Sequence, residues 1–172
     1  NEIEPAQFFH EVLTHRWYLA EQAGHDVPMG VAVQSYIDEH LSDYKIDTQV
    51  MKAWLTGATD RLSAETIALL QNPQNERYYS TASIWELSLK EGMGASNVKL
   101  NPHQVVTELK EQGFIELSLR AATLWRAFRL SSRIQRDPFD RLLLAQAQQK
   151  GLKLLTVDPQ MLQHELPEVL AA

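Results

Sequence analysis

The sequence contains no cysteine among its 172 residues, which excludes disulfide bonds and thiolate metal sites. It also lacks any apolar run near the ~18 residues that a membrane-spanning helix needs. The first five residues, Asn1 to Pro5, do not show the charged-then-apolar order of a secretion signal. We therefore expect a cytoplasmic protein without a membrane partner.

Positive charge is scarce as well. Lysine and arginine total 16 against 22 acidic residues, so the formal net charge is −6, which argues against holding nucleic acid by bulk electrostatics. One segment departs from this balance, with arginines at positions 120, 126, 129, 133, 136 and 141. Two explanations stay open for Arg120–Arg141: a solvated helix face, or a rim that binds phosphates beside an acidic pocket.

The length and a hydrophobic content of 44% suit one domain with a core of its own, with or without a small appendage. A boundary is expected near residues 42–45. Before it, the apolar spacing over residues 6–23 predicts an amphipathic helix that Gly24 ends, and Pro28 starts a second one. Residues 1–43 are therefore expected to form a helical hairpin, separate from a domain that spans residues 44–172.

From residue 44 onward, predicted strands and helices alternate. Strands are expected at residues 44–46, 77–80, 114–117 and 153–157. Helices are expected around residues 50–55, 63–71, 81–91, 102–112, 121–132 and 139–149. This alternation predicts an α/β fold with a parallel sheet covered by helices on both faces. In such sheets the functional groups collect beyond the carboxyl ends of the strands.

Four acidic residues fall where that rule places functional groups. Asp47 directly follows the first predicted strand and Asp158 directly follows the last one. Glu86 lies about one and a half turns into the helix after the second strand, and Asp140 lies in the first turn of the helix before the last strand. We expect all four carboxylates to reach one edge of the sheet.

Each acid also has a purely structural explanation. Asp47, Asp137 and Asp158 are well placed to cap helices, and a proline follows both Asp137 and Asp158, as suits a first helical position. The helix dipole favours Asp140 in a first turn. Glu86 is too deep in its helix to cap it and lies among apolar residues, although a solvent-facing position would also account for it. The sequence leaves both explanations open for each acid.

A cluster of carboxylates points to a hard divalent cation, Mg²⁺ or Mn²⁺, rather than to zinc. Without a cation the clustered carboxylates repel and raise one another's pKa values. The chemistry that uses such a cluster is phosphodiester hydrolysis, in which a metal activates water and offsets charge on the leaving oxygen.

From about residue 44 to the C-terminus the chain resembles the PIN-domain ribonucleases, specifically the VapC-type toxins of bacterial toxin–antitoxin pairs. The matching segments occur in the family's order: Ile46-Asp-Thr-Gln-Val50, Leu62-Ser63, Ser80-Thr-Ala-Ser-Ile-Trp-Glu-Leu87, Asp137-Pro-Phe-Asp-Arg-Leu-Leu-Leu-Ala-Gln-Ala147 and Leu155-Thr-Val-Asp158.

The resemblance implies that four residues hold a catalytic Mg²⁺ or Mn²⁺ ion, namely Asp47, Glu86, Asp140 and Asp158. It further implies cleavage of single-stranded RNA, a homodimer, and inhibition by a cognate antitoxin. Asp137 is interpreted as the helix cap. Two features depart from the family: Gln49 replaces the usual histidine, and residues 1–43 precede the first strand.

The leading hypothesis is that the protein is a metal-dependent endoribonuclease. The alternative is a PIN module without catalysis that binds RNA or a protein partner. A phosphohydrolase with a nucleophilic aspartate is a third possibility, but that chemistry normally wants a second aspartate where Gln49 stands. A Gly-x-x-x-x-Gly-Lys-Ser/Thr loop is also missing from the sequence, which argues against binding of nucleoside triphosphates.

Overall fold

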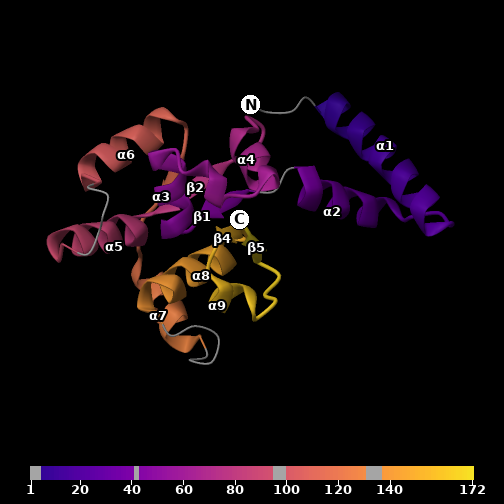
Figure 1. Cartoon of the computed structure of the whole chain (residues 1–172). Helices are drawn as coiled ribbons and strands as arrows, with labels where there is room; N and C mark the ends of the chain where they lie inside the picture. The colour runs from indigo at the N-terminus through magenta and orange to yellow at the C-terminus, as the bar shows by residue number, and fades with distance from the viewer. Residues whose placement is uncertain (1–4, 41–42, 95–99, 131–136) are drawn as a thin grey trace. The chain divides into compact units, whose positions relative to one another are not determined.

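The computed structural model describes residues 5–40, 43–94, 100–130 and 137–172 (Figure 1). The chain divides into two compact units. One comprises residues 1–42 with 73–75, and the other comprises residues 43–72 with 76–172. No helix in these ranges is long and apolar enough to cross a bilayer.

The first unit contains the expected helical hairpin, formed by α1 (Pro5–Ala23) and α2 (Met29–His40). Val12 and Ala32 are buried in it. His15 shares a 2.9 Å hydrogen bond with Ser35 of the second helix. At the turn, the Arg16 guanidinium donates two 2.9 Å hydrogen bonds to the Asp26 carboxylate. The prediction of an N-terminal helical hairpin is confirmed.

The second unit contains a parallel sheet, as predicted. Its strands are β1 (Tyr44–Ile46), β2 (Arg77–Ser80), β3 (Ile115–Leu117), β4 (Lys153–Thr156) and β5 (Val169–Ala171). They lie in the order β3-β2-β1-β4-β5, and every pairing is parallel. Since β1 is central and pairs with β4, the residues that follow these two strands lie at the same edge of the sheet.

Helices connect the strands, as parallel pairing requires. Within the described residues they are α3 (Thr48–Thr56), a short 3₁₀ turn (Thr59–Arg61), α4 (Ala64–Gln71), α5 (Thr81–Gly92), α6 (Pro102–Glu111), α7 (Ala121–Arg129), α8 (Pro138–Lys150) and α9 (Pro159–Leu162). Sequence signals explain most of their ends. Ser63 caps α4 by accepting the amide of Thr66, and Gly151 ends α8 in the left-handed conformation.

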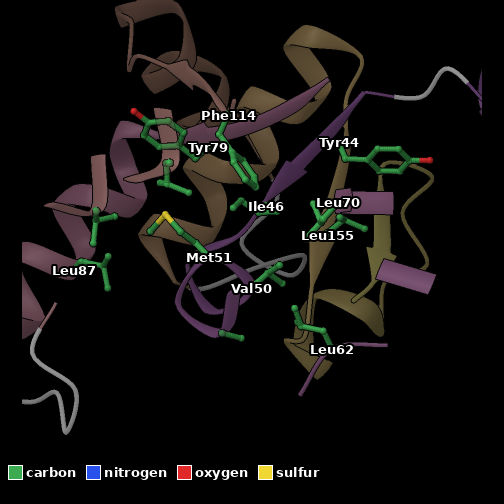
Figure 2. Close-up of a cluster of buried hydrophobic side chains, with 13 residues drawn as sticks. Tyr44, Ile46, Val50, Met51, Leu62, Leu70, Tyr79, Leu87, Phe114 and Leu155 are labelled. Atoms are coloured by element: carbon green, nitrogen blue, oxygen red, sulfur yellow. The ribbon is translucent and has the colours of Figure 1, made fainter. Parts of the chain in front are cut away.

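Two apolar clusters cover the two faces of the sheet. Figure 2 shows the first one, in which Ile46 and Tyr79 from the strands pack against residues of α3, α4 and α6. The second cluster lies on the opposite face, where Leu154 packs with Leu143 and Leu144 of α8 and with Ala127 of α7. Neighbouring strand residues such as Leu154 and Leu155 belong to different clusters because side chains alternate across a strand.

The described part of the chain contains three elements that the sequence pattern did not predict: the 3₁₀ turn, α9 and β5. A three-residue strand and a four-residue helix are too short to show a period. The helix predicted at residues 121–132 is described as α7 only as far as Arg129, and residues 131–132 lie outside the described part of the chain. The predicted loop at residues 94–99 also lies outside it, except for Gly94.

Candidate active site

Asp47 lies where β1 passes into α3. Its backbone amide still donates to the Leu155 carbonyl at 3.1 Å, so the strand pairing of β1 with β4 continues up to this residue. Its carboxylate caps α3 by accepting the Val50 amide at 2.7 Å, and the side chain is only 3% exposed. Burial raises the pKa of Asp47, and the charge of Glu86 raises it further.

Thr156, the last residue of β4, connects Asp47 with Asp158. Its hydroxyl donates to the second carboxylate oxygen of Asp47 and accepts the Asp158 amide at 3.0 Å. The Asp158 carboxylate in turn caps α9 by accepting the Gln160 amide at 2.9 Å. Asp47 and Asp158 are therefore both helix caps, and both lie at the carboxyl edge of the sheet.

Glu86 of α5 is 7% exposed, so a solvent-facing position does not explain it. One carboxylate oxygen accepts a hydrogen bond from Thr48, the residue after Asp47, and the Thr48 hydroxyl also lies 3.1 Å from Ser83. The other oxygen forms an ion pair with Lys90, one turn further along α5. The buried acid is thus hydrogen bonded to α3 and neutralised by a lysine that is itself half exposed.

Asp140 lies in the first turn of α8, behind the cap residue Asp137, whose carboxylate accepts the Phe139 amide at 2.8 Å. Burial and the surrounding carboxylates raise the pKa of Asp140 to about 7. The carboxylates responsible are Asp137, Asp158, Asp47 and Glu86. The structure therefore brings the other three predicted acids near enough to Asp140 for their charges to act on it.

The carboxylate oxygens of these four acids are ligands of the kind that a divalent cation prefers. Only carboxylate oxygens are offered, burial and the neighbouring negative charges raise the pKa of Asp140, and the Lys90 ammonium already compensates Glu86. Across residues 5–40, 43–94, 100–130 and 137–172, however, no three acidic or histidine side chains are already spaced as ligands of one ion. Asp47 and Glu86 instead use their oxygens for the hydrogen bonds described above. Side-chain rotation would be needed to bind a metal.

Sequence reasoning missed the residues that orient these acids, above all Thr48, Thr156 and Lys90. The only signal available was their spacing: Thr48 directly follows Asp47, Thr156 precedes Asp158 by two residues, and Lys90 follows Glu86 by four. Gln49, at the position of the family's usual histidine, is exposed.

The phosphate-binding rim expected at Arg120–Arg141 needs one correction. The half-buried Arg141 donates to the backbone carbonyls of Ala127, Phe128 and Leu130, so its guanidinium binds the C-terminal end of α7 and is not presented to a ligand. Arg120, Arg126 and Arg129 are exposed, whereas Arg133 and Arg136 lie outside the described residues.

The titration of Asp140 predicts how the stability of the metal-free protein depends on pH. The ordinary pKa of an aspartate is 3.8, whereas Asp140 in the folded protein keeps its proton until about pH 7. The folded state therefore binds more protons than the unfolded state between these values, and the free energy of unfolding falls as the pH rises through this interval. The raised pKa of Asp47 acts in the same direction.

Urea denaturation with EDTA at several values between about pH 5 and pH 8 tests this prediction. The Asp140→Asn variant cannot ionise at this position, so its free energy of unfolding should fall less steeply than that of the parent. Equal slopes for the two proteins would contradict the assignment of the titration to Asp140.

Comparison with known proteins agrees with this fold. A family model described as PIN domain matches residues 44–165, and another described as a domain of unknown function (DUF4032) matches residues 1–41. No curated protein matches the sequence.

Several solved structures share the fold at low sequence identity. A chain of a toxin–antitoxin complex from Klebsiella pneumoniae is 19% identical, with a TM-score of 0.53 over 75% of this chain and 97% of that one. A chain of VapBC2 from Rickettsia felis, bound to a DNA fragment from its promoter, is 15% identical, with a TM-score of 0.51 over 75% and 96%. A chain of VapBC-1 from nontypeable Haemophilus influenzae is 16% identical, with a TM-score of 0.52 over 74% and 96%.

These structural similarities concern the fold alone. The family match is stronger evidence because it spans residues 44–165, well over half of the chain. It confirms the resemblance drawn from the Asp-Pro-Phe-Asp-Arg segment and its companions. The chain belongs to the PIN-domain family.

Proposed function

We propose that the chain is a Mg²⁺- or Mn²⁺-dependent endoribonuclease and the toxin of a VapC-type toxin–antitoxin pair. One observation carries this proposal: Asp47, Glu86 and Asp158 lie close enough to Asp140 for their charges to raise its pKa. These are the acids of the PIN motifs, and they lie at the carboxyl edge of the sheet, where α/β folds collect functional groups.

In the proposed mechanism the four carboxylates would hold the ion, and the bound ion would supply Lewis acidity for the attack of water on the phosphodiester and would offset charge on the leaving oxygen. The chain's own residues set up the site. Thr156 holds the Asp47 carboxylate, and Thr48 holds that of Glu86. Asp137 fixes the first turn of α8, which carries Asp140.

An aromatic pair beside the acids supports single-stranded RNA as the substrate. Trp85 precedes Glu86, Phe139 precedes Asp140, and their rings meet edge to face with centroids 5.2 Å apart. The indole of Trp85 is 52% exposed. Exposed aromatic rings next to a nuclease site offer stacking surfaces for unpaired bases, which a base-paired duplex does not present.

We propose two protein partners. The structural neighbours come from toxin–antitoxin complexes, which supports a cognate antitoxin for this chain. The product of a neighbouring gene should then bind the chain and inhibit cleavage. An RNA substrate would place this reaction in the cytoplasm. For the homodimer, α7 exposes Leu124, Trp125 and Phe128 as an apolar surface that a second copy would cover. Light scattering would detect the dimer as a doubling of the 19.6 kDa mass.

We also propose that residues 44–172 form the PIN domain and that residues 1–43 are a separate helical extension. The change of family match near residue 42 and the hairpin of α1 and α2 support this division. Limited proteolysis between residues 40 and 44 should release a PIN fragment that keeps its helical circular dichroism. Loss of that signal on cleavage would argue for one inseparable domain.

A PIN module without catalysis remains the second candidate, and two observations favour it. Asp47 and Glu86 use their carboxylate oxygens for hydrogen bonds within the protein, and no preformed trio of ligands is found in the described residues. Such a module would bind RNA or a protein partner without needing a metal ion.

Mn²⁺ distinguishes the two candidates. If the four acids hold the ion, Mn²⁺ at about 100 times its Kd should stabilise the folded protein by ~2.7 kcal/mol. For a chain of this size this corresponds to a rise of roughly 5–10 °C in Tm. Thermal melts with increasing Mn²⁺ would show the shift, and EDTA should reverse it.

The same samples should cleave a single-stranded RNA, with EDTA abolishing cleavage and a duplex of the same sequence cut far more slowly. A Tm that does not respond to Mn²⁺, together with no cleavage, would favour the non-catalytic module. Equal cleavage of duplex and single strand would refute the role given to Trp85.

A further inference from the structure

A lysine in the middle of β1 is completely buried. Lys45 is 0% exposed. Its side chain points to the face of the sheet that α8 covers, whereas Tyr44 and Ile46 point to the opposite face. In the sheet it pairs with Leu154 of β4, which belongs to the apolar cluster beneath α8. A basic side chain therefore lies between Leu154 of β4 and Tyr78 of β2, both of which pack in the cluster beneath α8.

Packing alone does not account for this lysine. Removing an ammonium group from water costs several kcal/mol, roughly, unless partners compensate, whereas methionine fills a similar volume without that cost. Burial lowers the pKa of Lys45, with the charge of Asp47 acting in the opposite direction. A buried polar group of this kind calls for a specific partner.

The partner is a backbone carbonyl of α8. The Lys45 ammonium donates a 2.7 Å hydrogen bond to the carbonyl oxygen of Leu143, 98 residues away in the sequence. That carbonyl lies in the helix interior, where the amide four residues later already satisfies it. The bond is therefore not needed to satisfy Leu143, and its consequence is that β1 and α8 are held together.

Both ends of this bond lie next to acids of the site. Lys45 of β1 precedes Asp47 by two residues, and Leu143 follows Asp140 by three residues, nearly one helical turn. We propose that Lys45 is a positioning residue: its hydrogen bond to Leu143 holds α8 against β1 and so sets the spacing of the Asp47 and Asp140 carboxylates for a divalent cation. This inference rests on the proposed function.

Two substitutions at Lys45 separate the hydrogen bond from the amine group. Lys45→Met removes the hydrogen-bond donor at nearly constant volume, and Lys45→Gln removes the amine but keeps a donor. Leu154→Met is the matched control, because Leu154 is the in-register neighbour of Lys45 and is equally buried. For each protein, calorimetry measures the Kd for Mn²⁺ and urea denaturation in EDTA measures stability.

We expect Lys45→Met to bind Mn²⁺ about tenfold or more weakly, the range found when a group that orients metal ligands is lost. Its urea midpoint should be no lower than that of the parent, because an apolar group replaces a buried polar one. Lys45→Gln and Leu154→Met should bind Mn²⁺ within about threefold of the parent. If Lys45 positions the ligands, Lys45→Met should lose affinity for Mn²⁺ without losing stability. If Lys45 only supports the fold, Lys45→Met should have a lower urea midpoint and an unchanged affinity for Mn²⁺.

Three results would overturn the inference: parental Mn²⁺ affinity in Lys45→Met, equally weak binding in Lys45→Met and Lys45→Gln, or equally weak binding in Leu154→Met. If Lys45→Met does not fold, Lys45→Gln decides, with parental affinity as support and a tenfold loss as refutation. The parent protein is measured first. Failure of the parent to bind Mn²⁺ would refute the proposed function itself, whereas the outcomes above refute only the role of Lys45.

Discussion

Replacing Asp47 with asparagine is expected to reduce metal-dependent RNA cleavage by more than about a hundredfold, the upper end of the loss seen when only a supporting group is removed. Asparagine removes the negative charge and one anionic oxygen from the ligand set. It keeps an oxygen that can accept the Val50 amide and cap α3, and its amide nitrogen can face Thr156. The fold should therefore persist while cleavage is lost.

Cleavage of a single-stranded RNA in Mn²⁺ measures the effect, and circular dichroism verifies the fold. Asp137→Asn is the matched control, because Asp137 is also an acidic cap, at α8, and is assigned only a scaffolding role. Asparagine caps a helix as well as aspartate does, so this variant should keep most of the activity. Glu86→Gln should behave like Asp47→Asn. Undiminished cleavage by both Asp47→Asn and Glu86→Gln would refute the catalytic assignment.

Replacing Arg141 with methionine is expected to lower the free energy of unfolding by about 2–4 kcal/mol, since hydrogen bonds from a charged donor are among the stronger ones. The guanidinium donates to the Ala127 and Phe128 carbonyls at 2.7 and 3.3 Å, and also to that of Leu130. The last carbonyls of a helix have no partner within it, and the helix dipole favours a cation there.

Urea denaturation compares this variant with Arg129→Met, which removes an exposed arginine from the last turn of the same helix. Arg129→Met should change stability by less than about 1 kcal/mol. The two arginines should also differ in RNA binding, with Arg129→Met weakening it most at low salt. Equal losses of stability in the two variants would show that the contacts of Arg141 with α7 contribute little.

Much of the second unit could be predicted because its signals are local. Short strand segments between Gly, Pro and capping residues were predicted at the observed bounds of β1 and β2, and within one residue of those of β3 and β4. The strand β5 could not be predicted, because Val169–Ala171 has no period of its own and is a strand only by pairing with β4. Its formation depends on tertiary contacts that the local sequence does not encode.

The residues of the candidate site could likewise be predicted only in part. The rule that functional groups follow the strands placed Asp47 and Asp158 at one edge, and the deep helical position of Glu86 marked it as unusual. The partners of these acids depend on how β1 pairs with β4 and how α5 faces α3. Thr156, Thr48 and Lys45 acquire their roles from that register, which spacing in the sequence does not reveal.

Arg141 is the clearest example of a side chain whose role could not be predicted from the sequence. Its spacing from the other arginines predicted a shared surface, but helix periodicity does not tell which neighbouring element receives a side chain. In the structure the adjacent residue, Asp140, belongs to the acid cluster while Arg141 binds the end of α7. Two neighbouring residues on one helix thus serve different purposes.

In the proposed site, Asp47, Glu86, Asp140 and Asp158 together hold one divalent ion. Anomalous diffraction from crystals soaked in Mn²⁺ tests it directly, because the signal locates the metal without reference to activity. We predict a peak among these four carboxylates, with oxygen ligands at roughly the 2.0–2.2 Å typical of small divalent cations. The account would be contradicted by a saturating soak that gives no peak there, or a peak bound to other residues.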